Sequence, residues 1–322
     1  MAFALALLVA LAIDRWWGEP RARAHPVVWI GNYLGWVTTW VQHGTQAQPA
    51  QPDMPAFWRG AVAWCVGAAC VAAVAGVLQI ALLAMPWWVA GVGLGVLLKP
   101  LLAWAMLGDE VRAVETALGQ SLQAGRTRLR WLVSRDVTQL SATEVRESAI
   151  ETLAENLNDS VVAPIFWFVL LGLPGAALYR FANTADAMWG YPGLYTGRNW
   201  AWAGKWAARA DDVLSWLPAR ITAALLLVAG GWSGLSRAGA LATQARKTPS
   251  PNSGWPMAAM ALNLGVALRK PGVYVLHPQG NPATAVHTVL ALRYASKALL
   301  ALVVCAQAAM ILVAFFNKGV TP

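Results

Sequence analysis

A run of acidic side chains between Ser141 and Asp159 is the part of this chain best suited to chemistry. At about 100° per residue, spacings of 3, 4, 4 and 3 place four carboxylates and one amide on a single stripe of a helix. The residues at these spacings are Glu144, Glu147, Glu151, Glu155 and Asn158. Ser141 followed three residues later by Glu144 predicts a capping box, so the helix should begin there.

The C-terminal end of this stripe runs into an apolar segment that starts at Val161. Carboxylates at a membrane boundary are costly to desolvate unless they are paired or bind a metal. Mg²⁺ prefers oxygen ligands, keeps several waters and bridges to substrate phosphates. We therefore expect Glu155 and Asp159 to take part in a metal site. For Glu144 and Glu147 we expect an ordinary solvated helix face, with Arg146 as a partner.

Two other motifs combine acidic and amide side chains. Asn183 and Asp186 are three residues apart, so on a helix they share a face, although either residue type often serves as a cap or in a turn. Arg209 precedes the adjacent pair Asp211 and Asp212. One of these aspartates is expected to pair with Arg209 while the other faces a ligand, or all three form a local salt-bridge network.

Two motifs could bind or position substrate through a loop or a helix start. The stretch 250–256, SPNSGWP with Asn252 at its centre, leads into an alanine-rich helix. Its N-terminus would suit a phosphate, although an ordinary cap is commoner. The N-terminal motif places Asp14 and Gly18-Glu19-Pro20 before His25-Pro26. His25 could organise the loop as a hydrogen-bond donor or act as a base.

The composition places these motifs in a membrane. The chain has 322 residues, of which 58% are hydrophobic and 12% charged, about half the charged fraction of a soluble domain. We predict an all-α, polytopic integral membrane protein forming one domain over residues 1–322, with apolar spans at 1–17, 61–84, 86–107 and 298–316. Cys65, Cys70 and Cys305 lie in apolar segments without metal spacing, and we expect them to be small buried hydrophobes.

Long polar segments separate the spans, at 18–60, 108–160, 179–213 and 236–296. Arginines in the segments at 18–60 and 108–160 favour the cytoplasmic side by the positive-inside rule, so we expect a multi-pass protein of the inner membrane with cytoplasmic polar loops. The apolar runs 161–173 and 221–235 are short for a crossing, and we favour re-entrant helices that dip in and return.

The net positive charge of the chain lies in its last third. The net charge of +9 comes from residues 213–322, which hold 9 Lys and Arg and no acid. This pattern fits either attraction to anionic lipid or binding of phosphate-bearing small molecules. The basic residues are scattered among apolar spans, which argues against a nucleic-acid partner.

Taken together, these blocks resemble the CobD/CbiB family, the adenosylcobinamide-phosphate synthases of cobalamin biosynthesis. The resemblance covers nearly the whole chain in order. It rests on GEP and HPVVWIG, Ser134-Arg135-Asp136, AIETLAENLNDSVVAPIFW, NTADAMWGY, ARADDVLSWLPAR and SPNSGWPMAAMALNLGV. Some segments depart from the family: Leu268–Tyr274 stands where members have a glycine-rich turn, the stretch after Tyr274 is shorter, and the stretch from Gly190 to Asp211 carries a few extra residues.

The resemblance implies an inner-membrane ligase that joins adenosylcobyric acid to (R)-1-aminopropan-2-ol O-phosphate, or a related amino alcohol, with ATP and Mg²⁺. A corrinoid, an amino-alcohol phosphate and the bilayer are then the expected partners, and a homo-oligomer is left open. The expected metal ligands are Glu155, Asp159 and Asp186. The expected catalytic residues are Glu151, Glu155, Asn156, Asp211 and Asp212. The residues expected to bind substrate or phosphate are His25, Arg135, Asp136, Asn183, Arg209, Arg220 and Asn252.

A non-enzymatic function is the alternative. A polytopic transporter, or a sensor similar to the AmpE-type membrane proteins, would use intramembrane acids as ion or proton sites. The concentration of polar motifs in long loops argues against this alternative.

Overall fold

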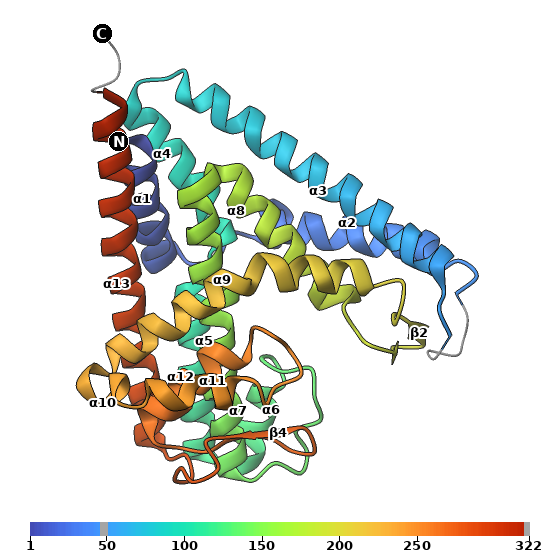
Figure 1. The fold of residues 1–322 in the computed structure, drawn as a ribbon, viewed down its shortest axis with the longest axis vertical. Coiled ribbons are helices and arrows are strands. Elements are labelled where there is room, and N and C mark those ends of the chain that lie inside the picture. Colours follow the sequence, from blue (N-terminus) through green and yellow to red (C-terminus); the bar gives the residue numbers. More distant parts are fainter. Residues whose placement is uncertain (46–50, 319–322) are drawn as a thin grey trace. The chain divides into compact units, whose positions relative to one another are not determined.

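The computed structural model describes residues 1–45 and 51–318, and helices make up most of it (Figure 1). Residues 46–50, inside the polar segment predicted at 18–60, lie outside the described part. The chain forms two compact units. The first comprises Met1–Leu102, Ala163–Leu214 and Ala306–Pro322, and the second comprises Ala103–Val162 and Ser215–Cys305. The predicted all-α class is confirmed.

The first unit is built from the N-terminal helices and the middle of the chain. Its elements are α1 (Ala2–Trp17), η1 (Ala22–Ala24), α2 (Pro26–Val41), α3 (Met54–Leu83), α4 (Trp87–Leu98), η2 (Lys99–Leu101), α8 (Ala163–Trp189), β1 (Leu194–Tyr195), β2 (Arg198–Asn199) and the start of α9 (Lys205–Ala229). Helix α1 packs along α4, and α3 along α8 (Figure 1). A short turn at Met85-Pro86 joins α3 to α4.

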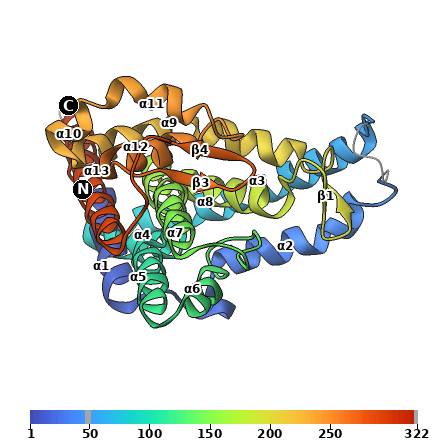
Figure 2. The ribbon, with the colours of Figure 1, turned by 90° about the horizontal axis from the view of Figure 1, so that it is seen from below.

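The second unit carries the acidic stripe. Its elements are α5 (Trp104–Gln120), α6 (Leu122–Leu129), α7 (Ala142–Leu157), the π-helical turn η3 (Asn158–Val162), the rest of α9, α10 (Gly231–Leu235), α11 (Ala238–Ala245), α12 (Gly254–Leu264), β3 (Leu268–Lys270), β4 (Tyr274–Leu276) and most of α13 (Ala285–Lys318). Strands β3 and β4 form an antiparallel hairpin that packs against α7 (Figure 2). Helix α12 also packs on α7.

Five helical stretches among the described residues are long and apolar enough to cross a membrane. They are Met54–Leu83, Trp87–Gln120, Ala142–Trp189, Lys205–Ala229 and Ala285–Phe316. These stretches support the prediction of a polytopic membrane protein. Helix α1, which carries the span predicted at 1–17, has 16 residues and is not among the five.

Helix α8 contains a break where the short apolar run 161–173 ends. Gly172 has φ 69° and ψ −154°, a conformation that only glycine adopts readily. The backbone N–H of Leu173, freed by the break, donates to Oε1 of Gln79 on α3 at 2.7 Å. A Cβ at position 172 would lie 2.2 Å from that same oxygen, so both the backbone angle and the close approach require glycine.

The second short run, 221–235, belongs to a longer helix than predicted. Helix α9 begins at Lys205 and ends at Ala229, and the separate α10 follows at Gly231. Most of this run is therefore not a short helix of its own, because residues before Ile221 continue the same helix. Whether α9 crosses the bilayer fully stays a prediction.

The three cysteines are not buried as predicted. Cys65, Cys70 and Cys305 are free and exposed. All three lie on α3 and α13, whose apolar stretches are only 17% and 22% buried within the chain. Helices facing lipid keep apolar side chains on their outer surface, so hydrophobicity predicted protein burial incorrectly here.

Candidate functional site

The C-terminal half of the acidic stripe lines a small polar pocket in the second unit. The pocket has a volume of about 160 Å³ and takes its walls from α7, the loop before α7 and the β3–β4 hairpin. Its lining residues are Leu132, Val133, Ser134, Arg135, Glu151, Thr152, Glu155, Asn156, Lys270 and Tyr274. Four predicted site residues, Arg135, Glu151, Glu155 and Asn156, are therefore brought together.

Local sequence positions the two pocket carboxylates. The predicted capping box is present at the start of α7: the Ser141 backbone N–H donates to Glu144 Oε2 at 2.7 Å, and the Glu144 N–H donates to Ser141 Oγ at 3.3 Å. Helix α7 then runs without interruption to Leu157. Glu151 and Glu155 are thus one turn apart on the same face.

Arg135 is the cation that meets this face. Its Nη2 donates to Glu151 Oε2 at 2.9 Å and to Ser148 Oγ at 2.7 Å. Its Nε and Nη1 are buried without a hydrogen-bond partner among the described residues. A guanidinium offers five donors in a fixed fork that matches phosphate and carboxylate groups. The unused side of this fork therefore leaves two buried donors unsatisfied.

The sequence reasoning did not include Lys270 and Tyr274 among the site residues. They are paired in the register of the β3–β4 hairpin, so their side chains lie on the same face of the hairpin. Burial, together with the nearby carboxylates of Glu151 and Glu155, raises the pKa of the Tyr274 hydroxyl, which interacts with Glu151. The sequence held one indication of these two residues: the segment that contains them, Leu268–Tyr274, departs from the family pattern.

Glu147 does not belong to the solvated part of the acidic stripe, where the sequence placed it. It was expected on a solvated face, but its exposed fraction is 0%, and its Oε1 lies 3.8 Å from Nη1 of Arg269 on β3. The hairpin and α12 cover this part of α7, which a helical periodicity alone does not reveal. Glu144 is partly exposed and takes part in the capping box with Ser141, as predicted.

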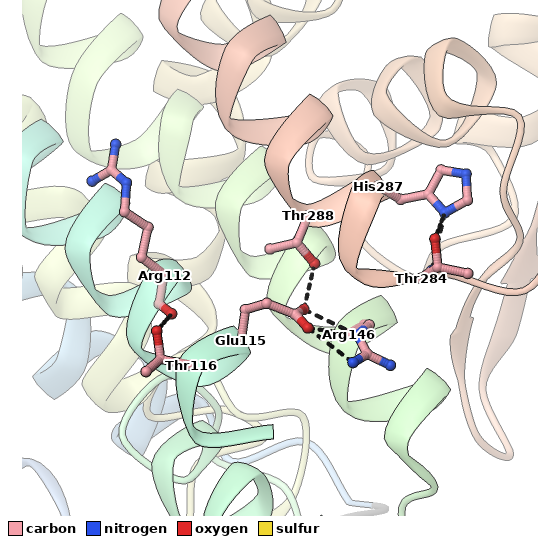
Figure 3. A network of polar contacts seen from close by, with 7 residues as sticks. All are labelled: Arg112, Glu115, Thr116, Arg146, Thr284, His287 and Thr288. Carbon is pink, nitrogen blue, oxygen red and sulfur yellow. Dashed lines mark hydrogen bonds and ion pairs between the residues drawn. The ribbon is translucent and has the colours of Figure 1, made fainter. Parts of the chain in front are cut away.

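The predicted partnership of Arg146 with the stripe is also wrong. Arg146 forms a bidentate ion pair with Glu115 of α5, with Nε at 3.0 Å from each carboxylate oxygen and Nη2 at 2.8 Å from Oε1 (Figure 3). Thr288 of α13 donates to the same carboxylate at 2.8 Å. This network ties three helices of the second unit together and does not contribute to the pocket lining.

The predicted residues near η3 form hydrogen bonds with neighbouring groups. Asn158 donates to Asp159 Oδ1 at 2.7 Å and accepts from Thr222 Oγ1 of α9 at 3.1 Å. Asn156 donates to the Thr152 carbonyl at 3.1 Å, which orients its amide at the pocket wall. The Thr222 hydrogen bond holds Asn158 against α9, and Asn158 does not line the pocket.

Arg220 and Asn252 bind each other. Arg220 Nη1 donates to Asn252 Oδ1 at 2.6 Å, and Nη2 donates to the Pro251 carbonyl at 3.1 Å. The guanidinium also lies over the rings of Trp216 and Trp255. This arrangement fixes the loop before α12 to α9. The predicted phosphate contacts of the two residues stay untested.

Asp136, although next to Arg135, is exposed and is not a lining residue. Its carboxylate accepts from the Thr138 backbone N–H at 2.9 Å and from the Thr138 hydroxyl at 3.0 Å. These hydrogen bonds lower the pKa of Asp136. The geometry is that of a local turn.

The other predicted site residues belong to the first unit. His25 caps α2, accepting from the Val27 N–H at its Nδ1, while its Nε2 lies 3.1 Å from Glu19. Its Nε2 must therefore carry the proton, which matches the loop-organising role. Asn183 and Asp186 lie on α8, and Arg180 donates to Asn183 at 3.4 Å.

On α9 the predicted pairing of Arg209 is confirmed for one of the two aspartates. Arg209 Nη1 lies 3.4 Å from Asp212 Oδ2, and the Arg209 side chain is 75% exposed. Asp211 also lies on α9, in the first unit. The predicted metal ligands are divided between the units, since Asp186 belongs to the first and Glu155 and Asp159 to the second. Across the described residues, no group of three or more His, Cys, Asp or Glu is arranged to hold a metal, and the metal site stays a prediction.

Comparison with known proteins identifies the family. The model of the family described as CobD/Cbib protein matches residues 7–313. The chain is 40% identical over 278 residues to "Probable cobalamin biosynthesis protein CobD" of Methanothermobacter thermautotrophicus, covering 84% of this chain and 85% of that one. It is 40% identical over 277 residues to "Cobalamin biosynthesis protein CobD" of Chromobacterium violaceum, covering 82% and 81%. No solved structure matches the chain. With a family model across almost its entire length and relatives at this level of identity, the chain belongs to the CobD/Cbib family.

Proposed function

We propose that this protein acts in cobalamin biosynthesis as an ATP-dependent ligase that joins adenosylcobyric acid to an amino-alcohol phosphate. The relatives it matches are named for cobalamin biosynthesis. The observation that carries the finer proposal is the composition of the small pocket, where Arg135 and Lys270 lie with Glu151 and Glu155. An aminoalkyl phosphate has the complementary charges, a phosphate at one end and an ammonium at the other.

The size of the pocket supports binding of the smallest of the three substrates, the amino-alcohol phosphate. A volume of about 160 Å³ is well below the roughly 300–1,000 Å³ typical of sites for drug-sized ligands. It suits a short phosphate ester, whereas a nucleotide or a corrinoid would need space beyond it. We therefore assign only the amino-alcohol phosphate to this pocket.

The charged residues then have distinct roles. Arg135 would bind the phosphate through its unpaired Nε and Nη1, assisted by Lys270. Glu155 would accept the proton of the ammonium, which makes the amine nucleophilic. Glu151, held by Arg135 and near Tyr274, would fix the position of the fork.

The reaction requires activation of a carboxylate. In the proposed sequence, an oxygen of the corrin carboxylate attacks the γ-phosphorus of ATP, and ADP leaves. The amine nitrogen then attacks the acyl carbon, forming the C–N bond as the C–O bond to phosphate breaks. Mg²⁺ would supply charge neutralisation of the transferred phosphoryl group. It uses one or two carboxylates with phosphate oxygens and waters, and Asp159, four residues after Glu155, would be the protein carboxylate that holds it.

A reconstituted assay tests this proposal. Purified protein is supplied with ATP, Mg²⁺, adenosylcobyric acid and (R)-1-aminopropan-2-ol O-phosphate, and the amide product is followed by mass. We expect Glu155→Gln to lower kcat/KM at least 100-fold and Lys270→Met to raise KM for the amine at least 10-fold. Asp109→Asn and Lys247→Met, at exposed residues elsewhere in the second unit, are the matched controls.

Two results would count against the proposal. Wild-type protein that consumes no adenosylcobyric acid with any amino-alcohol phosphate would favour a transporter or sensor. Variants of Glu155 and Lys270 that behave like their controls would move the amine site elsewhere.

A further inference from the structure

A large apolar cavity lies within the first unit, and the proposed ligase reaction does not use it. Its volume is about 820 Å³, and its walls come from α1, α2, α3, α4 and α8 with the connecting segments. Most wall side chains are aliphatic or aromatic, among them Ile13, Trp29, Val71, Val74, Leu78 and Phe181. The size is within the range for lipid-sized and drug-sized ligands.

The charged groups at the wall form ion pairs with one another. Lys99, which is 2% exposed, has its Nζ 2.7 Å from Glu19 Oε1 and 3.3 Å from Asp14 Oδ1. Glu19 Oε2 in turn lies 3.1 Å from His25 Nε2. The Tyr33 hydroxyl donates to the Ala63 carbonyl at 2.8 Å. The charged cluster therefore closes one part of the wall and offers little to a polar ligand.

This chemistry excludes the substrates of the proposed reaction. A corrinoid and a nucleotide each carry many hydrogen-bonding groups, and every such group left unsatisfied costs about 1–3 kcal/mol. A hydrocarbon loses nothing in the same surroundings and gains roughly 0.8 kcal/mol for each CH₂ buried from water. The occupant must be mainly hydrocarbon.

Several residues of the cavity wall are exposed, and they indicate the side from which a hydrocarbon ligand would enter. Val74 and Leu78 of α3 are 61% and 41% exposed, and Val96 of α4 is 52% exposed. Both helices belong to stretches able to cross a membrane, and the α3 stretch is only 17% buried. In a bilayer these side chains face lipid tails, which are the most abundant hydrocarbon there. We propose that this cavity holds an acyl chain of a membrane phospholipid.

Native mass spectrometry of the detergent-extracted protein tests the proposal, with two tryptophan variants on α3. Val74→Trp places an indole at the cavity wall, whereas Val77→Trp adds the same bulk at a position that is 67% exposed and does not line the cavity. We expect wild type and Val77→Trp to retain one phospholipid per chain, and Val74→Trp to retain at least fivefold less. Absence of bound lipid from wild type, or equal retention by the two variants, would overturn the proposal. A stoichiometric apolar compound other than a phospholipid would overturn the assigned source.

Cysteine reactivity gives a second test that does not depend on a bulky substitution. Cys70 lines the cavity, and Cys65, also exposed on α3, does not. Two variants each keep one of these cysteines, with the other and Cys305 replaced by Ser. Removing lipid by detergent exchange should speed N-ethylmaleimide labelling of Cys70 at least threefold and leave Cys65 unchanged. Equal acceleration at both cysteines, or none at Cys70, would contradict an occupied cavity.

Discussion

Two of the arginine–glutamate pairs that involve α7 of the second unit differ in how completely their hydrogen-bonding groups are paired. Arg146 meets Glu115 through three short contacts, and Thr288 donates a fourth hydrogen bond to that carboxylate (Figure 3). Arg135 gives its Nη2 to Glu151 and leaves Nε and Nη1 buried and unpaired among the described residues. The two pairs bury their arginine to the same degree, with side chains 20% exposed.

The difference separates a structural pair from a binding pair. A buried ion pair with all its groups bonded positions helices and has nothing left for a ligand. A buried guanidinium with unused donors has an unmet desolvation cost, which an anion can relieve. We therefore expect changes at Arg146 and Glu115 to affect stability and changes at Arg135 to affect substrate binding.

The largest effect should come from Arg135→Lys. Lysine keeps the charge beside Glu151 but lacks the planar fork, so the proposed phosphate contacts are lost. A loss of about 3 kcal/mol in transition-state binding corresponds to a fall in kcat/KM of roughly 100-fold. The matched variant Arg146→Lys should stay within about twofold of wild type in the same steady-state assay. Equal losses in the two variants would mean that the pairs do not differ in function.

Glu115→Gln is expected to lower stability and to leave activity unchanged. Removing this charge leaves Arg146 partly buried without its counter-ion, which should lower the free energy of unfolding by about 2 kcal/mol. The lower thermal midpoint should be visible by fluorescence-detected size-exclusion chromatography after heating. Activity per folded molecule should not change, and a selective loss of activity would place Glu115 in the site instead.

Tyr274→Phe should weaken substrate binding less than Arg135→Lys does. The variant removes the hydroxyl beside Glu151 and should raise KM for the amino-alcohol phosphate about fivefold, the equivalent of about 1 kcal/mol. The Tyr274 pKa is raised above its ordinary value near 10, so the hydroxyl stays protonated below that pH. The ratio of variant to wild-type KM should therefore be constant from about pH 7 to pH 9. A KM ratio that changes within this pH range would show that an ionisable group other than the Tyr274 hydroxyl contributes to the effect of the variant.

The smallest effect is expected for Asp136→Asn. Asp136 is adjacent to Arg135 in sequence, but its carboxylate bonds Thr138 and lies outside the pocket. Asparagine can make the same turn, so kinetic constants should stay within about twofold of wild type. A tenfold loss would return Asp136 to the substrate contacts that the sequence suggested.

Local patterns predicted the elements of the site well. The 3–4 spacing and the Ser141–Glu144 box placed α7 correctly, because helix starts and helix faces depend on residues a few positions apart. The same local reasoning failed for Glu147, which the distant β3–β4 hairpin helps to bury. It also did not predict the π-helical turn that begins at Asn158.

Composition and short-range periodicity were enough to predict the all-α membrane class, the start and face of α7, and the candidate carboxylates. The tertiary structure decided which residues meet: Arg135 with Glu151, Lys270 and Tyr274 at the pocket, and Arg146 with Glu115. These partners are separated along the chain by 16 or more residues. Contacts over such distances depend on how helices and the hairpin pack, and spacing along one helix contains no information about them.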